Sequence, residues 1–231
     1  GDGGGVVVDA VLPFAYRHAM AVVVSGHGHT CALLASAGGG LKCWGWNQFG
    51  QLGVGDTAVR GDEPGEMGAG LPEVVLGPGL TAVAVAAGEG HTCAAADDGS
   101  LACWGYNNYG QLGVGSTDSQ TSPQAVSVGA GPAAGAGVLF VAAGRFHSCA
   151  LVRRGGLYCW GLDNAGQLGI GSPATYQASP QRVSVGGRTD GVLAVSAGSE
   201  HTCALLSGGG LHCWGANWAG QLGLGDTGYR S

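Results

Sequence analysis

Histidine and cysteine recur in this sequence at spacings that could support metal binding or disulfide chemistry. A Gly-x-x-His-Thr/Ser-Cys string is followed, ten or twelve residues after its cysteine, by a Cys-Trp-Gly string, and the pattern occurs four times. A period of this length indicates an array of similar structural units. The repeated residues are His29, His91, His147 and His201, the pairs Cys31 and Cys43, Cys93 and Cys103, Cys149 and Cys159, Cys203 and Cys213, and Trp44, Trp104, Trp160 and Trp214.

A zinc site is one interpretation of each histidine with its two cysteines. Residues i and i+2 of a strand share a face, so His29 and Cys31 could ligate one ion together with Cys43. A closed structural zinc site needs a fourth ligand, and four such sites in series would be unusual. The alternative is a buried, hydrogen-bonded histidine beside an oxidised cysteine pair. We therefore expect neither a metal nor another cofactor.

The cysteine spacing also predicts a hairpin register. Cys93 and Cys103 are symmetric about Asp98, and a loop in which Gly99 adopts the left-handed conformation would place them opposite each other. The same construction applies to the pairs Cys149–Cys159 and Cys203–Cys213, and Cys31 and Cys43, twelve residues apart, keep the parity with a longer loop. Four disulfides are therefore expected, each contributing about 2–3 kcal/mol. Buried free thiols are the alternative. Paired cysteines favour an extracellular or other oxidising compartment, with the cytoplasm as the second choice.

Short strands must position these residues. After a proline (Leu71-Pro72, Pro123 or Pro180) comes a short apolar strand, then a nearly continuous apolar run, the His-Thr-Cys strand and the Cys-Trp-Gly strand. Four short antiparallel strands per unit are typical of β-propeller blades. We expect an all-β protein with a Gly-rich lead-in over residues 1–11 and a propeller segment over 12–231, its repeats at about 12–57, 71–117, 123–172 and 180–228.

The repeated string, continued as Gly-x-Asn-x-x-Gly-Gln-Leu-Gly, resembles the regulator of chromosome condensation repeat. That resemblance implies a seven-bladed β-propeller, in the superfamily of a bacterial β-lactamase inhibitor protein. Four repeats would form a partial arc of such a ring. Because an incomplete arc leaves apolar faces uncovered, we expect further blades of a longer chain, or a second copy, to complete it.

Composition disfavours several function classes. The formal net charge is −6 with nine Lys and Arg residues, and no basic run is present that could follow a phosphate backbone. Apolar runs are shorter than the ~20 residues that span a bilayer. The glycine-rich strings lack the Gly-Lys-Ser/Thr of a phosphate loop, and Asp163 is more simply a turn residue than a catalytic one. We expect no direct nucleic-acid binding, no membrane span and no enzymatic activity.

Positions at which the repeats differ are the candidates for binding. The repeated tryptophans have identical offsets, which indicates packing within or between blades. In contrast, the two residues before each repeated histidine vary, and the resemblance implies that their rim is a partner-binding face; solvated loop ends are the alternative. The candidate residues are His27, Glu89, Arg145, Phe146, Ser199 and Glu200, with Trp46 and Trp218 at variable positions nearby.

We therefore predict a scaffold-like, non-catalytic module that binds a protein partner of unknown identity. Two alternatives remain at this point. The family name suggests a guanine-nucleotide exchange factor for a small GTPase, although no protruding element that could displace nucleotide is recognisable. The superfamily suggests an enzyme-inhibitor propeller.

Overall fold

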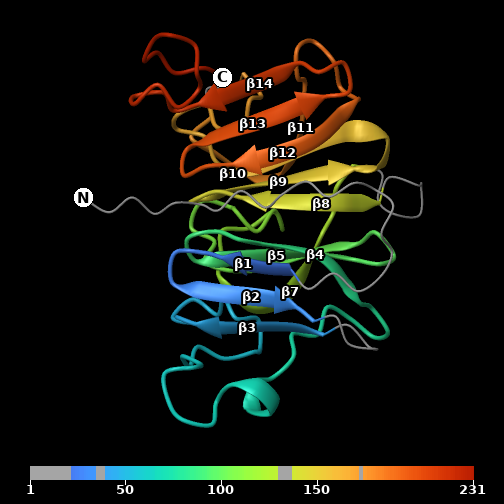
Figure 1. Cartoon of the computed structure of the whole chain (residues 1–231), viewed down its shortest axis with the longest axis vertical. Coiled ribbons are helices and arrows are strands. Elements are labelled where there is room, and N and C mark those ends of the chain that lie inside the picture. The colour runs from blue at the N-terminus through green and yellow to red at the C-terminus, as the bar shows by residue number, and fades with distance from the viewer. Residues whose placement is uncertain (1–21, 35–39, 130–136, 172–173) are drawn as a thin grey trace.

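The protein forms four antiparallel β-sheets in series (Figure 1). The computed structural model describes residues 22–34, 40–129, 137–171 and 174–231. The predicted lead-in and the predicted repeat limits at residues 12 and 172 lie outside these ranges. The first sheet contains β1 (Val22–Ser25), β2 (His29–Leu33) and β3 (Leu41–Gly45), and the second contains β4 (Ala82–Ala87), β5 (His91–Ala96), β6 (Leu101–Gly105) and β7 (Gln120–Val126). The third contains β8 (Val138–Ala143), β9 (His147–Val152), β10 (Gly156–Leu162) and β11 (Tyr176–Val183), and the fourth contains β12 (Val192–Ala197), β13 (His201–Leu206) and β14 (Leu211–Gly215).

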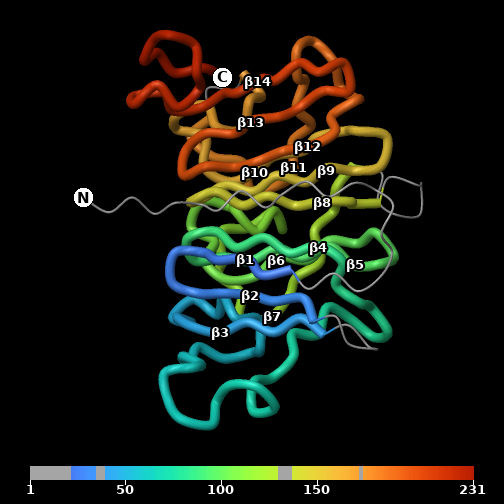
Figure 2. Tube along the Cα trace, in the orientation of Figure 1, coloured from blue at the N-terminus to red at the C-terminus, as the bar shows by residue number. Residues whose placement is uncertain are grey.

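The sheets follow one another as blades of a partial β-propeller. The first strand of each sheet lies beside the first strand of the next, so β1, β4, β8 and β12 form the inner edge. The chain then runs outward through each sheet in order. The first and fourth sheets consequently lie at opposite ends of the arc (Figure 2). The predicted all-β fold of propeller blades is confirmed.

The proline-containing strands belong to different sheets from those expected. Pro123 lies within β7, which pairs with β6 as the outer strand of the second sheet, and Pro180 lies within β11 in the third. Both prolines fall where the pairing register shifts, between the partners of Cys103 and Gly105 or of Cys159 and Gly161. Such an irregular edge tolerates a residue without an amide N–H. Each such strand therefore closes the preceding sheet instead of opening the following one.

The outer strand of the first sheet is reduced to two isolated bridges. Arg60 pairs with Gly45 and Val74 pairs with Leu41. These positions correspond to Gln120 and Val126, the two ends of β7. Between the bridges the chain makes an excursion over residues 61–73 that includes the 3₁₀ turn η1 (Gly68–Gly70). Lys42 anchors it, because its Nζ donates a 3.0 Å hydrogen bond to the carbonyl of Gly68.

The central hairpin of each sheet has the register predicted from the cysteine spacing. The turn between β5 and β6 contains Gly99 at φ +87°, and Gly209 has φ +81° at the corresponding place in the fourth sheet. In the third sheet the turn η3 (Arg153–Gly155) places Arg154, a residue other than glycine, at φ +72°. Four disulfides join the directly opposed pairs Cys31–Cys43, Cys93–Cys103, Cys149–Cys159 and Cys203–Cys213.

Apolar cores fill the spaces between consecutive sheets. The cores include Leu52 with Trp104, Leu112 with Trp160, and Leu168 with Trp214, in order along the chain. In each case the leucine comes from the Gly-Gln-Leu-Gly loop of one unit and the tryptophan from the next unit. Trp104, Trp160 and Trp214 are therefore inter-blade packing residues, as their constant offset predicts.

A set of hydrogen bonds between consecutive units, here called a joint, accompanies each core. At the first joint, Nε2 of His29 lies 2.8 Å from Oγ1 of Thr92. That hydroxyl donates to the carbonyl of Gln51 at 2.8 Å, and Nε1 of Trp104 donates to the same carbonyl at 2.9 Å. The same contacts recur with His91, Ser148, Gln111 and Trp160, and with His147, Thr202, Gln167 and Trp214. Each histidine thus connects its own unit to the next.

Candidate partner-binding face

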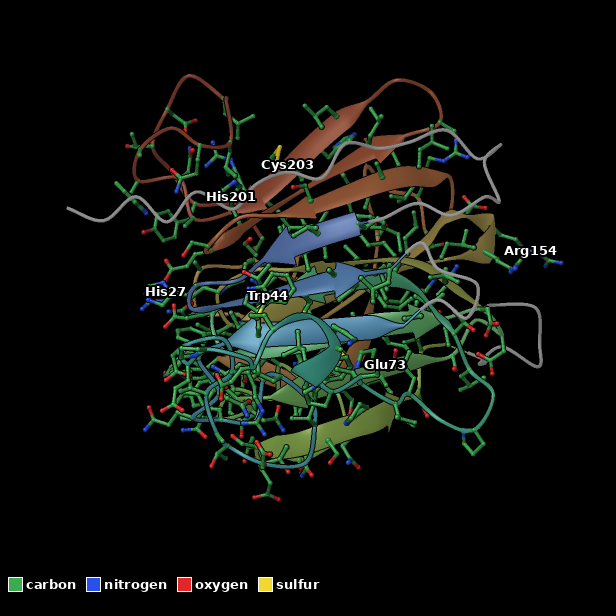
Figure 3. The ribbon with its side chains drawn as sticks, turned by 60° about the horizontal axis from the view of Figure 1, so that its bottom comes forward. His27, Trp44, Glu73, Arg154, His201 and Cys203 are labelled. Carbon is green, nitrogen blue, oxygen red and sulfur yellow. A yellow bond between two sulfur atoms is a disulfide. The ribbon has the colours of Figure 1, made fainter. Side chains whose placement is uncertain are left out.

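The variable loops before the repeated histidines lie side by side along one edge of the arc. The amide of His27 donates to the carbonyl of Gly88 at 3.3 Å, and that of Glu89 donates to the carbonyl of Arg145 at 3.3 Å. The amide of Arg145 in turn donates to the carbonyl of Ser199 at 3.1 Å. His27 lies at one edge of the molecule and Arg154, in a hairpin turn, at the opposite edge (Figure 3). The sequence-predicted loop residues therefore share a face, hereafter the loop face.

An ion pair connects two of these loops. Nε of Arg145 contacts Oε2 of Glu89, and both side chains remain partly exposed. This hydrogen bond raises the pKa of Arg145 above its ordinary value. The guanidinium carbon of Arg145 also lies 4.9 Å from the centre of the Phe146 ring, within the range of a cation–π contact. Exposed ion pairs stabilise a fold only slightly, so this pair chiefly orients the arginine on the surface.

A continuous row of aromatic rings extends from Phe146 across the loop face. Its members, here called the aromatic strip, are Trp46, Phe49, Tyr106, Tyr109 and Phe146. Ring centres lie 5.2 Å apart for Trp46 and Phe49, 4.6 Å for Phe49 and Tyr106, 5.8 Å for Tyr106 and Phe146, and 5.1 Å for Tyr109 and Phe146. All five side chains are half-buried, whereas the repeated tryptophans of the second and third sheets are fully buried. The strip therefore crosses three units at the surface.

Three members of the strip were not identified from the sequence. Phe49 and Tyr109 occupy one loop position, at which the later repeats have Ala165 and Ala219. Tyr106 corresponds to Trp46, and the later repeats have Leu162 and Ala216 there. Variation at these loop positions was the available signal.

Small residues make room for the strip. A Cβ atom on Gly90 would lie 3.3 Å from both Phe49 and Tyr106, and one on Gly28 would lie 3.1 Å from Trp46. These glycines stand where the later repeats have Phe146 and Glu200. Their lack of a side chain allows the rings of neighbouring units to approach each other.

The remaining predicted residues lie apart from the strip. Trp218 is 68% exposed and lines a hollow of about 490 Å³ on the fourth sheet, together with Arg145 and residues Ser196–His201. Ser199 and Glu200 belong to that hollow. His27 is exposed, at the first-sheet end of the row of loops. The candidate residues thus divide between the aromatic strip, with Glu89, and the hollow, and Arg145 contributes to both.

The repeated histidines and cysteines have structural surroundings. The sulfur atoms are bonded to one another, so they cannot act as thiolate zinc ligands. Burial lowers the pKa of His29 to about 4 and those of His91 and His147 to about 3. His91 and Ser148 resemble a catalytic base and nucleophile in their 2.8 Å contact, yet both are buried at the joint. A substrate could not reach them there.

Asp163 also has a structural role in this arrangement. Its Oδ1 accepts a 3.0 Å hydrogen bond from the amide of Leu168. Asn47, Asn107 and Asn217 accept the corresponding bond in the other units. Partial burial raises the pKa of Asp163.

In the described ranges, no helix has the length and hydropathy of a membrane span.

Known proteins share this sequence pattern and fold. A family model described as the regulator of chromosome condensation (RCC1) repeat matches residues 39–95, 98–151 and 154–205, and a second model of that description matches 21–51, 82–111, 138–167 and 192–221. The ultraviolet-B receptor UVR8 of Arabidopsis thaliana is 34% identical over 210 residues, which cover 90% of this chain and 44% of the receptor.

Two solved structures are similar. Human WBSCR16 has a TM-score of 0.69 at 25% identity, and the match covers 85% of this chain and 47% of the WBSCR16 chain. Yeast RCC1 (Prp20), solved bound to Kap60, has a TM-score of 0.68 at 23% identity. The match covers 95% of this chain and 49% of the yeast chain. The chain thus spans less than half of each of these relatives. With four repeats matched in sequence and the corresponding blades present in the structure, the chain belongs to the RCC1 repeat family.

Proposed function

We propose that this partial propeller is a non-catalytic module that binds a protein partner through its loop face. The aromatic strip is the observation that carries the proposal. Aromatic rings and arginine are enriched among the residues that dominate binding free energy at protein interfaces. Here five rings and Arg145 form one surface, and Arg145 is already oriented by Glu89 and the Phe146 ring.

The frame beneath the strip supports this role. Its members are held by loops that are fixed to buried joints and to disulfide-linked hairpins. A preorganised surface loses little conformational entropy when a partner binds. Yeast RCC1 (Prp20), which shares this fold, has been solved bound to Kap60, so a protein that contains this fold takes a protein partner.

A comparison of two surface variants tests the proposal. Arg145→Ala combined with Phe146→Ala removes the cationic end of the strip and its last ring. Arg154→Asn is the matched control, because it removes a positive charge at the opposite edge and asparagine tolerates the φ of +72°. Wild type and both variants are used as baits in cells of the source organism, and captured proteins are quantified by mass spectrometry. Binding to the purified partner is then measured by calorimetry.

We expect the strip variant to bind at least about tenfold more weakly, since truncation of a central aromatic or arginine often costs ~2 kcal/mol or more. The Arg154→Asn variant should bind like wild type. Unchanged binding of the strip variant, at unchanged melting temperature, would refute a role for this surface.

A nucleotide-release assay with purified small GTPases separates the proposal from the exchange-factor alternative, which predicts accelerated nucleotide release. Inhibition of a captured enzyme would favour the inhibitor alternative.

A further inference from the structure

The fourth sheet has an uncovered face built from residues that are buried in the other sheets. Leu211 is 68% exposed, whereas Leu41, Leu101 and Leu157, at the same repeat position, are at most 2% exposed. Leu205 is 38% and Leu224 50% exposed. The cysteines of this sheet are also partly exposed, while the other six are at most 1% exposed. We call this surface, with His201 and Gln221, the fourth-sheet face.

The fourth-sheet face contains half of a joint. At the three complete joints, the repeated histidine and the carbonyl of the repeated glutamine bind a hydroxyl and an indole of the next sheet. His201 and Gln221 occupy these positions here. A Cβ atom on Gly53, Gly113 or Gly169 would overlap the next indole, whereas one on Gly223 would meet open space. The hollow beside His201 adjoins this space.

The first sheet carries the other half, in which Val23 is exposed and Thr30 and Trp44 are partly buried. Val23 is 57% exposed, although Val85, Val141 and Val195 at the corresponding position are at most 5% exposed. Thr30 and Trp44 correspond to the hydroxyl and indole residues of the complete joints. In the described part of the chain, neither side chain has a hydrogen-bond partner. We call this surface, formed by Val23, Thr30 and Trp44, the first-sheet face.

We propose that the fourth-sheet face of one copy of this chain binds the first-sheet face of a second copy, forming one more joint. Nε2 of His201 would donate to Oγ1 of Thr30 in the second copy. That hydroxyl and Nε1 of Trp44 would donate to the carbonyl of Gln221. Val23 and Leu211 would meet in the new core, as Val85 and Leu41 share the core between the first and second sheets.

A second copy is the occupant because the chain carries both matching halves. The residue types and order on the two faces are those of the three complete joints. Such a contact is head to tail, so two copies either close into a ring of eight sheets or continue to add copies. Val23, Thr30, Leu211 and Gln221 lie outside the aromatic strip, so substitutions there test this proposal separately from the proposed function.

The oligomeric state of the full chain tests the proposal. Light scattering after size-exclusion chromatography should give a mass of at least two chains, each of 22.7 kDa, over a concentration series. Val23→Glu and Leu211→Glu each place a charge on one face, at side chains exposed in the isolated chain. Each variant should therefore fold and remain monomeric. Val83→Glu, at a valine that is 52% exposed and lies on neither face, is the matched control and should associate like wild type.

Mixing the two monomeric variants gives the sharpest result. The Val23→Glu chain keeps a native fourth-sheet face and the Leu211→Glu chain a native first-sheet face, so an equal mixture should form pairs that grow no further. Thr30→Val, which removes only the hydroxyl, should weaken wild-type association by up to about tenfold.

Four outcomes would overturn the proposal. The first is a wild-type chain that stays monomeric, whose faces would then take another occupant, such as a further repeat of the same polypeptide. The others are association that persists in Val23→Glu or Leu211→Glu, an equal mixture that stays monomeric, and a Val83→Glu control that dissociates as well.

Discussion

The buried repeat histidines act as neutral hydrogen-bond donors. At the first joint, the hydroxyl of Thr92 donates its proton to Gln51, so it can only accept from Nε2 of His29. This fixes the imidazole tautomer. In the described ranges, Nδ1 of each buried repeat histidine has no hydrogen-bond partner. A second proton would be buried there without an acceptor, in agreement with the lowered pKa values.

Stability should consequently fall in acid. Between pH 6.5 and about 3, the histidines bind protons in the unfolded chain, whereas His91 and His147 remain neutral in the folded chain. Because the unfolded state binds more protons, the free energy of unfolding decreases as the pH falls, by up to ~1.4 kcal/mol per pH unit for each such histidine. Urea denaturation between pH 7 and about pH 4 would measure this slope.

A single variant isolates the histidine contribution. His147→Gln keeps a side-chain N–H that can donate to Thr202 but cannot titrate. Its pH slope should be smaller than that of wild type by up to ~1.4 kcal/mol per pH unit. Equal slopes for the two proteins would show that His147 does not contribute to the acid sensitivity.

At the scale of elements, loops of one unit pack against the outer strand of the next. Gly110 has φ +71°, and a Cβ atom there would lie 2.5 Å from Cα of Ala178 in β11. Gly220 has φ +75° at the same repeat position, but a Cβ atom there would meet nothing within 4 Å. A side chain at either glycine would strain the backbone, but only a side chain at Gly110 would also overlap the next unit.

Alanine at these positions should have unequal effects. Both substitutions incur the left-handed strain of about 1–2 kcal/mol, and Gly110→Ala should cost a further 1–3 kcal/mol, roughly, because β11 must shift. Thermal unfolding of the two variants, followed on monomeric protein, measures the difference. Equal destabilisation would mean that β11 yields without cost at this contact.

Strands and hairpins are more predictable from the sequence than the contacts that they make with other strands and units. The register of Cys93 and Cys103 follows from their spacing about the turn at Gly99, because the whole hairpin is local. The sequence predicts the strand containing Pro123 in the following sheet, whereas that strand pairs with β6. No local signal indicates that the loop after Gly105 folds back onto its own sheet. The aromatic strip was only partly foreseen, because Phe49, Tyr106 and Phe146 meet across three units.

At the scale of the whole molecule, the sheets of the described structure make their main contacts with their sequence neighbours. Repeat proteins of this kind gain stability from each unit and from each interface between units. Leu168 is fully buried between the third and fourth sheets, whereas Leu222, its counterpart, follows β14, and in the described residues no further sheet packs against it. A truncation at Leu168 should therefore destabilise two sheets, whereas a truncation at Leu222 should destabilise mainly the last one.

Hydrogen exchange would show that difference. Leu168→Ala should cost about 2–5 kcal/mol and speed amide exchange in the strands on both sides of its core, β9, β10 and β12–β14. Leu222→Ala should speed exchange mainly in β14 and the loop after it. Exchange measured by mass spectrometry on monomeric protein tests this. Uniform acceleration reaching β1–β3 in the Leu222→Ala variant would instead indicate one cooperative block.

The excursion over residues 61–73 shows how much extra length the arc tolerates. Thirteen residues separate Arg60 from Val74, whereas five separate Gln120 from Val126, yet both pairs reach the same positions on their sheets. The added length leaves the cysteine register of the first hairpin intact. The outer edge is therefore a permissive insertion point. A reporter peptide or a grafted recognition loop placed there could extend the domain's repertoire while the hairpin and its disulfide stay intact.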